Sequence, residues 1–265
     1  MIKLKDVTFK YNEKIVLDNI NLEINQGEYI SIIGSNGSGK STLVKLLNSI
    51  LKPIEGTIYV DDIETINSEL LFQVRKNIGI VFQNPDNQII SSVVEEDVAF
   101  GPTNLELDNI SEIVDKSLEE VSLSEKKYQL TNNLSGGEKQ KLAMAGVLAM
   151  EPKCIIVDEA TSMLDNNSRA AVLDVLRGLN EKGITVICIT HNIEDTLESN
   201  RILVMNKGRI VLDNSPLNVF KNVSLLEEIN LEVPIINKLA CELGIDLKEV
   251  LDMDEFVDVL LGNMK

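Results

Sequence analysis

Residues 34–41 read Gly34-Ser35-Asn36-Gly37-Ser38-Gly39-Lys40-Ser41 and match the pattern G-x-x-x-x-G-K-[ST] at every fixed position. The glycines permit a turn whose backbone N–H groups all point inward, where they can bind phosphate oxygens. A largely apolar run at 29–33 precedes the loop, and a helical pattern beginning with Thr42 follows it, which is the context the motif requires. This phosphate loop (residues 34–42) predicts a nucleoside triphosphate site, in preference to a plain glycine-rich turn. Lys40 would reach the outer phosphates, and Ser41 would hold Mg²⁺.

The composition indicates one large globular domain, with or without an appendage. The chain has 265 residues, of which 44% are hydrophobic, and a formal net charge of −17 from 42 acidic and 25 basic residues. Nucleic-acid-binding proteins carry a basic face, so we expect no nucleic-acid partner. No apolar run approaches the roughly 18 residues that span a bilayer. Residues 1–14 lack the apolar core of a secretory signal, which favours a cytosolic protein.

The three cysteines are far apart in the sequence. Cys154 and Cys188 lie in apolar runs typical of strands, so we expect them to be reduced, buried thiols. With Cys241 as the third, their spacing supports neither a metal site nor a disulfide framework.

The first 28 residues alternate between apolar and polar side chains, which predicts an antiparallel β layer with a turn near residues 12–13. Tyr11 lies at this turn. An aromatic side chain there could stack on a nucleotide base, or could be a half-exposed strand residue, and the pattern supports both interpretations equally.

A mostly helical insertion is expected between two halves of a parallel sheet. Apolar strands at 57–60 and 78–82 precede it, and Gln83 follows the second. Residues from about 91 to 133 are acidic and helical in pattern, with Pro102 breaking the run. We place the whole helical subdomain at about residues 84–150.

Two further strands end in chemically active side chains. The apolar run from Cys154 ends in Asp158 and Glu159, where one carboxylate could hold Mg²⁺ and the other could act as general base on a water molecule. The strand at 185–190 ends in His191, the only histidine. Ligand sites gather at the carboxyl ends of parallel strands, so we expect His191 near the γ-phosphate.

The segment Leu134-Ser-Gly-Gly-Glu-Lys-Gln140, called here the signature segment, opens an alanine-rich helix. The N–H groups of Gly136 and Gly137 and the hydroxyl of Ser135 could form a second anion site. A plain helix cap explains the same residues equally well.

The last part of the chain differs in composition from the rest. A closing hairpin is expected at 202–205 and 210–212, and residues 215–265 then form short amphipathic helices with an apolar cluster that includes Val250 and Leu251. This extension could cap the main core or form an oligomerisation surface.

In their order and approximate spacing, the phosphate loop, Gln83, the signature segment, Asp158–Glu159, the Ser162–Asp165 stretch and His191 resemble the ATP-binding-cassette (ABC) ATPases. The resemblance covers residues 1–213. It implies a head-to-tail dimer with ATP held between the phosphate loop of one subunit and Ser135–Gly137 of the other. In this family Tyr11 would stack on adenine, Gln83 would sense Mg²⁺ and relay closure to a membrane partner, and Asp165 would communicate across the interface. Asn166 stands where the family often has proline.

The chain looks, within that family, like an energy-coupling factor (ECF) transporter ATPase of the cobalt-importer type. The features that carry this resemblance are Phe82–Gln88, Val94–Pro102 and Leu231–Ile235. ECF importers commonly use two paralogous ATPases. The stretches Lys139-Gln140 and Glu159–Ser162 look like the corresponding stretches of the first of that pair. The resemblance therefore implies a heterodimer with a close paralogue, in preference to a homodimer. It also implies an integral membrane scaffold and a substrate-binding membrane protein for vitamins or metal ions, with the chain at the cytoplasmic face. A conventional importer or exporter, or a non-transport cassette, is the alternative.

The expected fold follows from this resemblance. It is an α/β fold in residues 1–214, with a RecA-like parallel-sheet core, an N-terminal antiparallel β layer and a helical subdomain. Residues 215–265 would add a small helical extension that contacts the dimer partner.

Overall fold

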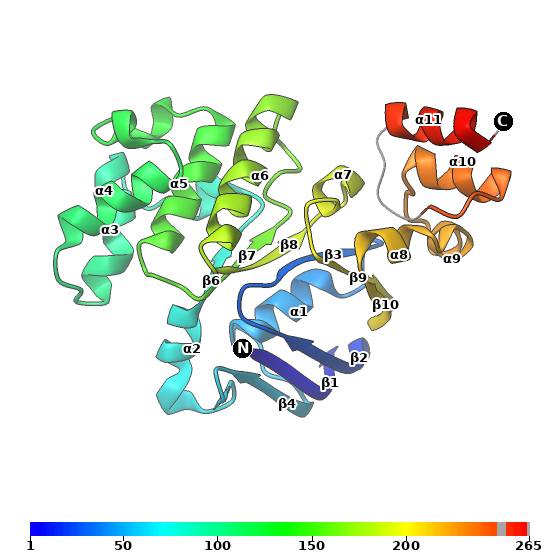
Figure 1. The fold of residues 1–265 in the computed structure, drawn as a ribbon. Coiled ribbons are helices and arrows are strands. Elements are labelled where there is room, and N and C mark those ends of the chain that lie inside the picture. Colours follow the sequence, from blue (N-terminus) through cyan, green and yellow to red (C-terminus); the bar gives the residue numbers. More distant parts are fainter. Residues whose placement is uncertain (248–252, 264–265) are drawn as a thin grey trace.

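The computed structural model describes residues 1–247 and 253–263, which form two β-sheets and the helices around them (Figure 1). Val250 and Leu251 of the expected C-terminal apolar cluster lie outside the described residues. Within the described ranges, no helix is long and apolar enough to cross a membrane.

The first sheet is the antiparallel layer expected from the N-terminal alternation. Its strand order is β2-β1-β4-β5, and its core side carries apolar residues such as Ile2 and Leu4. The strands are β1 (Ile2–Tyr11), β2 (Lys14–Ile24), β4 (Glu55–Val60) and β5 (Ile63–Glu64).

The second sheet has the order β10-β9-β3-β8-β7-β6, and its last five strands are mutually parallel. The hairpin strand β10 is antiparallel to β9 at one edge. The strands are β3 (Tyr29–Gly34), β6 (Ile78–Val81), β7 (Cys154–Asp158), β8 (Thr185–Ile189), β9 (Arg201–Asn206) and β10 (Arg209–Asn214). Since β3, β7 and β8 are neighbours, the phosphate loop and the residues after Asp158 and Ile189 meet at one sheet edge.

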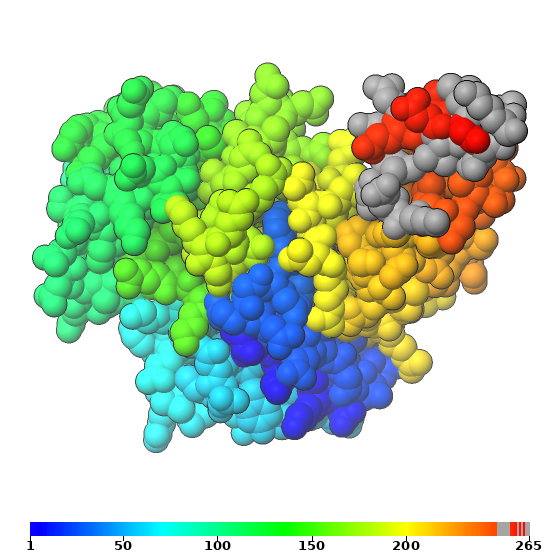
Figure 2. All heavy atoms as spheres, viewed as in Figure 1, coloured from blue at the N-terminus to red at the C-terminus, as the bar shows by residue number. Residues whose placement is uncertain are grey.

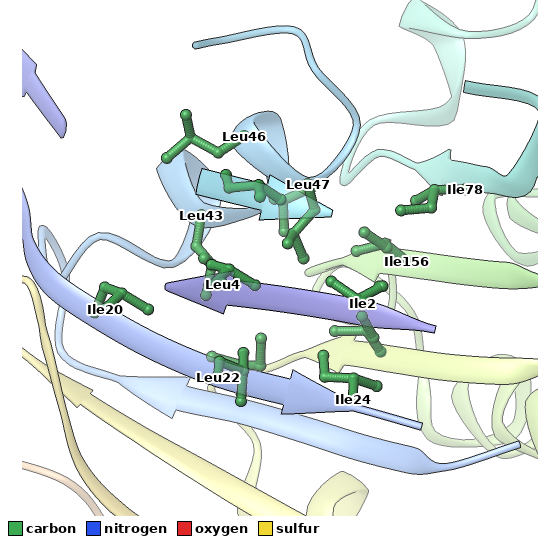
Figure 3. Close-up of a cluster of buried hydrophobic side chains, with 14 of the residues drawn as sticks. Ile2, Leu4, Ile20, Leu22, Ile24, Leu43, Leu46, Leu47, Ile78 and Ile156 are labelled. Carbon is green, nitrogen blue, oxygen red and sulfur yellow. The ribbon is translucent and has the colours of Figure 1, made fainter. Parts of the chain in front are cut away.

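The short helix α1 (Lys40–Leu47) lies between the two sheets. Its Leu43 and Leu47 pack in one buried cluster with Leu4 of the first sheet and Ile78 and Ile156 of the second (Figure 3). Burying leucine or isoleucine stabilises the fold by about 1.5–3 kcal/mol per side chain. This cluster therefore fixes the helix that follows the phosphate loop.

The helical subdomain lies between β6 and β7 in the chain and covers that end of the second sheet (Figure 1). Its main helices are α3 (Val94–Asn104), α4 (Ile110–Glu120) and α5 (Gly136–Leu148). Short 3₁₀ turns lie before α3, at Pro85–Asn87, and between α4 and α5, at Ser124–Lys126 and Thr131–Asn133. Two helices outside it are α2 (Leu71–Asn77), after a 3₁₀ turn at Ser68–Leu70, and α6 (Asn166–Glu181). The prediction that Pro102 breaks the helix is wrong, because α3 continues to Asn104. Proline removes one backbone hydrogen bond, here the one to the Val98 carbonyl, and α3 ends only two residues after Pro102.

The C-terminal helices form two separate apolar clusters. The first two, α8 (Pro216–Phe220) and α9 (Val223–Glu228), bury Val219, Phe220 and Leu226 against Ile202 and Val204 of β9. The next two, α10 (Ile235–Leu243) and α11 (Met253–Asn263), share a smaller cluster. Figure 2 shows these orange and red atoms at the opposite end of the molecule from the green helical subdomain.

Candidate functional site

The phosphate loop leaves a fully buried strand and enters a helix through left-handed glycines. All six residues of β3 are buried, and Gly37 and Gly39 have φ angles of 78° and 108°. A Cβ atom on Gly39 would lie 2.7 Å from a methyl group of Leu17 and 2.9 Å from the Val16 carbonyl oxygen. Glycine is therefore required at this position by both conformation and space.

The Lys40 ammonium lies inside this loop. Its Nζ atom donates to the Gly34 carbonyl at 2.7 Å and to the Ser35 carbonyl at 3.3 Å, and the residue is only 5% exposed. Burial lowers the pKa of Lys40, and the charges of Glu159 and Asp158 partly oppose that shift. The loop thus holds a positive charge next to two carboxylates.

A cleft of about 170 Å³ lies over the loop, lined by residues 36–42, Val16 and Glu159. Two buried oxygens in this region, Ser38 Oγ and Asp158 Oδ1, have no hydrogen-bond partner among the residues that the structure describes. Burial and the Glu159 charge raise the pKa of Asp158, while a hydrogen bond from the Ser41 side chain opposes that shift. A loop of N–H groups, a buried ammonium and unpaired oxygens suit a phosphate group with a hard cation.

Glu159, His191 and Gln83 meet at the same edge of the sheet. A Glu159 carboxylate oxygen lies 2.6 Å from His191 Nε2. Gln83 Nε2 donates to the Ser162 hydroxyl at 3.2 Å, and that hydroxyl donates to the Glu159 carbonyl at 2.8 Å. Glu159 also has a left-handed backbone conformation, with a φ of 53°. The structure therefore brings together three side chains that the sequence analysis selected separately.

The signature segment forms a complete helix cap. The Ser135 hydroxyl accepts the Glu138 N–H at 3.4 Å, and the Glu138 carboxylate accepts the Ser135 N–H at 2.9 Å, which is a capping box at the start of α5. Gly136 is exposed, whereas Gly137 packs so closely on Ser168 that a Cβ atom would lie 2.7 Å from that residue's Cβ. The helix cap is therefore present, and Ser135 and Gly136 are exposed beside it.

Asp165 and Tyr11 occupy simpler surroundings. Asp165 caps α6, accepting the N–H groups of Asn167 and Ser168 at 3.0 Å each, and the Ser168 hydroxyl bond is the main cause of its lowered pKa. Tyr11 ends β1, is 45% exposed and meets Phe9 edge to face at 4.9 Å between ring centroids. Its ring is accessible for stacking.

The family model described as ABC transporter matches residues 17–162. The chain is 46% identical to the energy-coupling factor transporter ATP-binding protein EcfA1 of Clostridium novyi, over 98% of this chain and 97% of the relative. The chain belongs to the ECF transporter ATP-binding proteins of the ABC family. A cobalt import ATP-binding protein CbiO of Syntrophus aciditrophicus is 42% identical, over 96% of this chain and 94% of the relative.

Solved structures agree with this membership. CbiO1 of Clostridium perfringens, described as part of an ABC transporter complex, superposes with a TM-score of 0.79 at 38% identity, covering 90% of this chain and 97% of that chain. A dimeric ATP-binding cassette bound to ADP and Pi gives a TM-score of 0.72 at 33% identity, covering 82% and 99%. This ECF ATPase is thus an ATP-hydrolysing transport subunit with the expected α/β fold.

Three contacts around the site of this ECF ATPase were missed in the sequence. Ser162 links Gln83 to Glu159, as described above, although it was read only as part of a motif. Lys139 Nζ pairs with Asp86 at 2.6 Å, and Gln140 Nε2 donates to the Phe82 carbonyl at 3.1 Å. Asp86 lies in the Phe82–Gln88 stretch, and Lys139 and Gln140 lie in the signature segment. The complementary charged and amide side chains of these two stretches were the signal in the sequence that could have predicted their contact.

Both buried cysteines behave as expected. Cys154 and Cys188 are buried, and burial raises the pKa of each thiol, for Cys188 to about 12. Cys241 is exposed on α10.

Proposed function

We propose that this ECF ATPase hydrolyses Mg²⁺-bound ATP with Glu159 as general base and uses the cycle to drive an integral membrane scaffold. The observation that carries the proposal is that Glu159 both lines the cleft over the phosphate loop and contacts His191 at 2.6 Å. A base must lie within reach of the water that attacks the terminal phosphate. Glu159 would be that base.

The phosphate loop and its surroundings supply the binding groups. The N–H groups of residues 34–42 and the Lys40 ammonium would bind the phosphates, and His191 would contact the γ-phosphate. Ser41 and Asp158, with Gln83 as a further oxygen donor, would hold Mg²⁺, which favours oxygen ligands and usually keeps phosphates and waters as its others. The cation would neutralise charge that develops on the phosphates.

Glu159 would then accept a proton from water. Its carboxylate is oriented by His191 on one side and its backbone by the Ser162 hydroxyl on the other. Gln83 joins the same chain of contacts through Ser162. Movement at Gln83 is thereby connected to the position of the base.

The proposed working state is a head-to-tail dimer. In it the start of α5, where Ser135 and Gly136 are exposed and Gly137 is buried beneath them, would bind ATP held by the other subunit. Tyr11 would stack on adenine, and Asp165 would communicate between sites. Two observations support this arrangement. The start of α5 keeps exposed polar groups on the helical subdomain, and a similar cassette has been solved as a dimer with ADP and Pi. A heterodimer with a close paralogue is favoured over a homodimer, as Lys139-Gln140 and Glu159–Ser162 imply.

The membrane partners are proposed from an exposed apolar surface. Phe82, Ile90 and Phe100 are all more than one third exposed, and they lie just before, within and at the end of the segment from Gln83 to Phe100. A coupling helix of the scaffold would bind there, at the cytoplasmic face of the membrane, and the scaffold would reorient a substrate-binding membrane protein for a vitamin or metal ion. The relatives named for energy-coupling factor transport and cobalt import support this class of system.

The test of the catalytic role is Glu159→Gln. Losing a general base typically slows a reaction by about 10² to 10⁴, so ATP turnover should fall by that factor while ATP binding is kept. Glu151→Gln is a matched control, because Glu151 has the same φ of 53° but lies before the opposite end of β7. Wild-type turnover by Glu159→Gln in the purified complex would refute the role.

The partners are tested by affinity purification of the chain from detergent-solubilised membranes of its host. Recovery of a second cassette ATPase, one apolar scaffold and small membrane proteins would support the ECF assembly. A two-copy permease with a soluble binding protein would indicate a conventional importer instead.

A further inference from the structure

Asp195 is a fully buried carboxylate beneath the catalytic edge of the second sheet. It lies in the short helix α7 (Ile193–Thr196), four residues after His191, and is 0% exposed. A charge removed from water is unfavourable unless its oxygens are paired. Its position therefore requires donors from the surrounding chain.

The donors to Asp195 come from three separate segments. The hydroxyls of Thr161 and Thr190 each donate to Oδ2 at 2.9 Å, and Arg169 Nε donates to Oδ1 at 2.5 Å. Both threonines are buried. One carboxylate thus ties together the loop after β7, the loop after β8 and the first turn of α6.

Each threonine lies close to a residue of the proposed catalytic pair. Thr161 is two residues after Glu159. Thr190 immediately precedes His191, and its hydroxyl also accepts the Asn192 N–H at 2.9 Å, so the backbone is held on both sides of the histidine. The two loops carry side chains that meet at 2.6 Å. The distance between these two side chains therefore depends on the contacts that hold the two loops in place.

We propose that Asp195 is a positioning residue that sets the Glu159 and His191 side chains at their working distance. The inference rests on the proposed function, because it matters for turnover only if Glu159 and His191 act in hydrolysis. Glu159 has an uncommon backbone conformation, and such conformations persist only when their surroundings enforce them. Asp195 holds the loops that carry Glu159 and His191 through its hydrogen bonds with Thr161 and Thr190. A displacement of about 1 Å in a catalytic group can reduce the rate by about 10²-fold.

The adjacent acid, Glu194, provides a matched control. It also pairs with Arg169, at 3.3 Å from Nη2, but its side chain is 81% exposed. In the described part of the chain, its carboxylate pairs with this arginine and with neither threonine. Removing its charge perturbs the same arginine without releasing the loops.

The experiment compares Asp195→Asn with Glu194→Gln in the full-length chain, assayed in the complex in which it is purified. We expect Asp195→Asn to lower kcat by about 10- to 100-fold. The KM for ATP should stay within about threefold, because the phosphate loop lies on β3 and α1 and takes no part in the cluster. Glu194→Gln should match the wild type. Wild-type kcat in Asp195→Asn would overturn the inference.

A double-mutant cycle separates positioning from general destabilisation. In a Glu159→Gln background, Asp195→Asn should cause little further loss, because the group it positions is already inactive. An equal loss in both backgrounds would overturn the inference alone. Wild-type turnover by Glu159→Gln itself would refute the proposed base, and this inference with it.

Thr161 keeps the inference testable if Asp195→Asn does not fold. Thr161→Val preserves shape and removes one hydroxyl donor, so kcat should fall about 2- to 10-fold, the usual worth of one hydrogen bond. Thr161→Ser should restore it. Wild-type kcat in Thr161→Val would count against the proposal.

Discussion

Two regions of the molecule differ in whether their polar groups have hydrogen-bond partners within the chain. One is the edge of the second sheet where the phosphate loop, Asp158–Glu159 and His191 lie, called here the loop edge, and the other is the signature segment. At the loop edge, Ser38 Oγ and Asp158 Oδ1 are buried without partners, Lys40 is buried and Glu159 has a left-handed backbone. In the signature segment, Ser135 and Glu138 complete each other's hydrogen bonds within the chain. In a stable protein interior, buried polar groups have hydrogen-bond partners. The loop edge departs from this rule, and the signature segment follows it.

This difference indicates where each region obtains its function. A ligand bound at the loop edge would supply partners for its buried polar groups. A region whose groups are satisfied locally needs no ligand to be stable, and the role proposed for it is at the ATP of the other subunit. The two regions should therefore respond differently to mutation.

Among the variants that compare these two regions, Lys40→Ala is expected to have the largest effect. This change removes the positive charge at the centre of the phosphate loop, and loss of such a group typically costs about 10² to 10³ in turnover. Steady-state ATPase assays would measure it. Lys52→Ala, at an exposed position just beyond α1, is the control and should leave turnover unchanged. Turnover within a few-fold of wild type in Lys40→Ala would show that the loop edge is not the site.

A smaller effect, on stability, is expected from Gly39→Ala. The φ of 108° and the contacts at 2.7 and 2.9 Å predict a loss of about 1–3 kcal/mol in the free energy of unfolding, measured by urea titration. Gly178→Ala is the opposite case, because Gly178 lies within α6 with open space around it. Alanine there should stabilise the helix by about 0.5–1 kcal/mol. Equal effects from the two changes would contradict the geometry at Gly39.

The sequence predicted the loop edge well because its signals are local. The glycine spacing specified the phosphate loop, and apolar runs ending in Asp158–Glu159 and His191 placed these residues at strand ends. Because the strands are parallel neighbours, the three segments had to meet. The antiparallel layer and the closing hairpin also followed from two-residue periodicity.

The remaining features depend on contacts between distant segments. Asp195 was missed because its partners Thr161, Arg169 and Thr190 lie on separate elements and have no shared motif. Pro102 was misread because a local breaker was judged without its place near the helix end. In the C-terminal extension, the amphipathic pattern predicted helices but not the surface that their apolar faces would cover. In the structure, α8 and α9 cover β9.

The smallest effect is expected from Asp165→Asn in the cap of α6. Hydrogen bonds from Ser168 and Asn167 lower the pKa of Asp165 below its ordinary value of 3.8. A carboxylate with a lowered pKa in the folded state adds stability above that ordinary value, and the stability is lost as pH falls through the folded pKa. Asn keeps an oxygen acceptor but not the charge. The variant should therefore lose less stability than the wild type between about pH 5 and pH 2.

Thermal unfolding across this pH range is the measurement, and Asp174→Asn, at an exposed position on the same helix, is the control. Identical pH dependence in Asp165→Asn and the wild type would show that the charge does not strengthen this cap.

The most direct test of the central claim is the association of the Glu159→Gln chain with its ATPase partner, whether a paralogue or a second copy, with and without Mg²⁺ and ATP. Analytical ultracentrifugation would give the dissociation constant. The account predicts that nucleotide tightens association at least about tenfold, and that Ser135→Ala in the same background weakens this effect. A dissociation constant that ATP does not change, in a chain that still binds ATP, would contradict the claim that the signature segment acts on the partner's nucleotide.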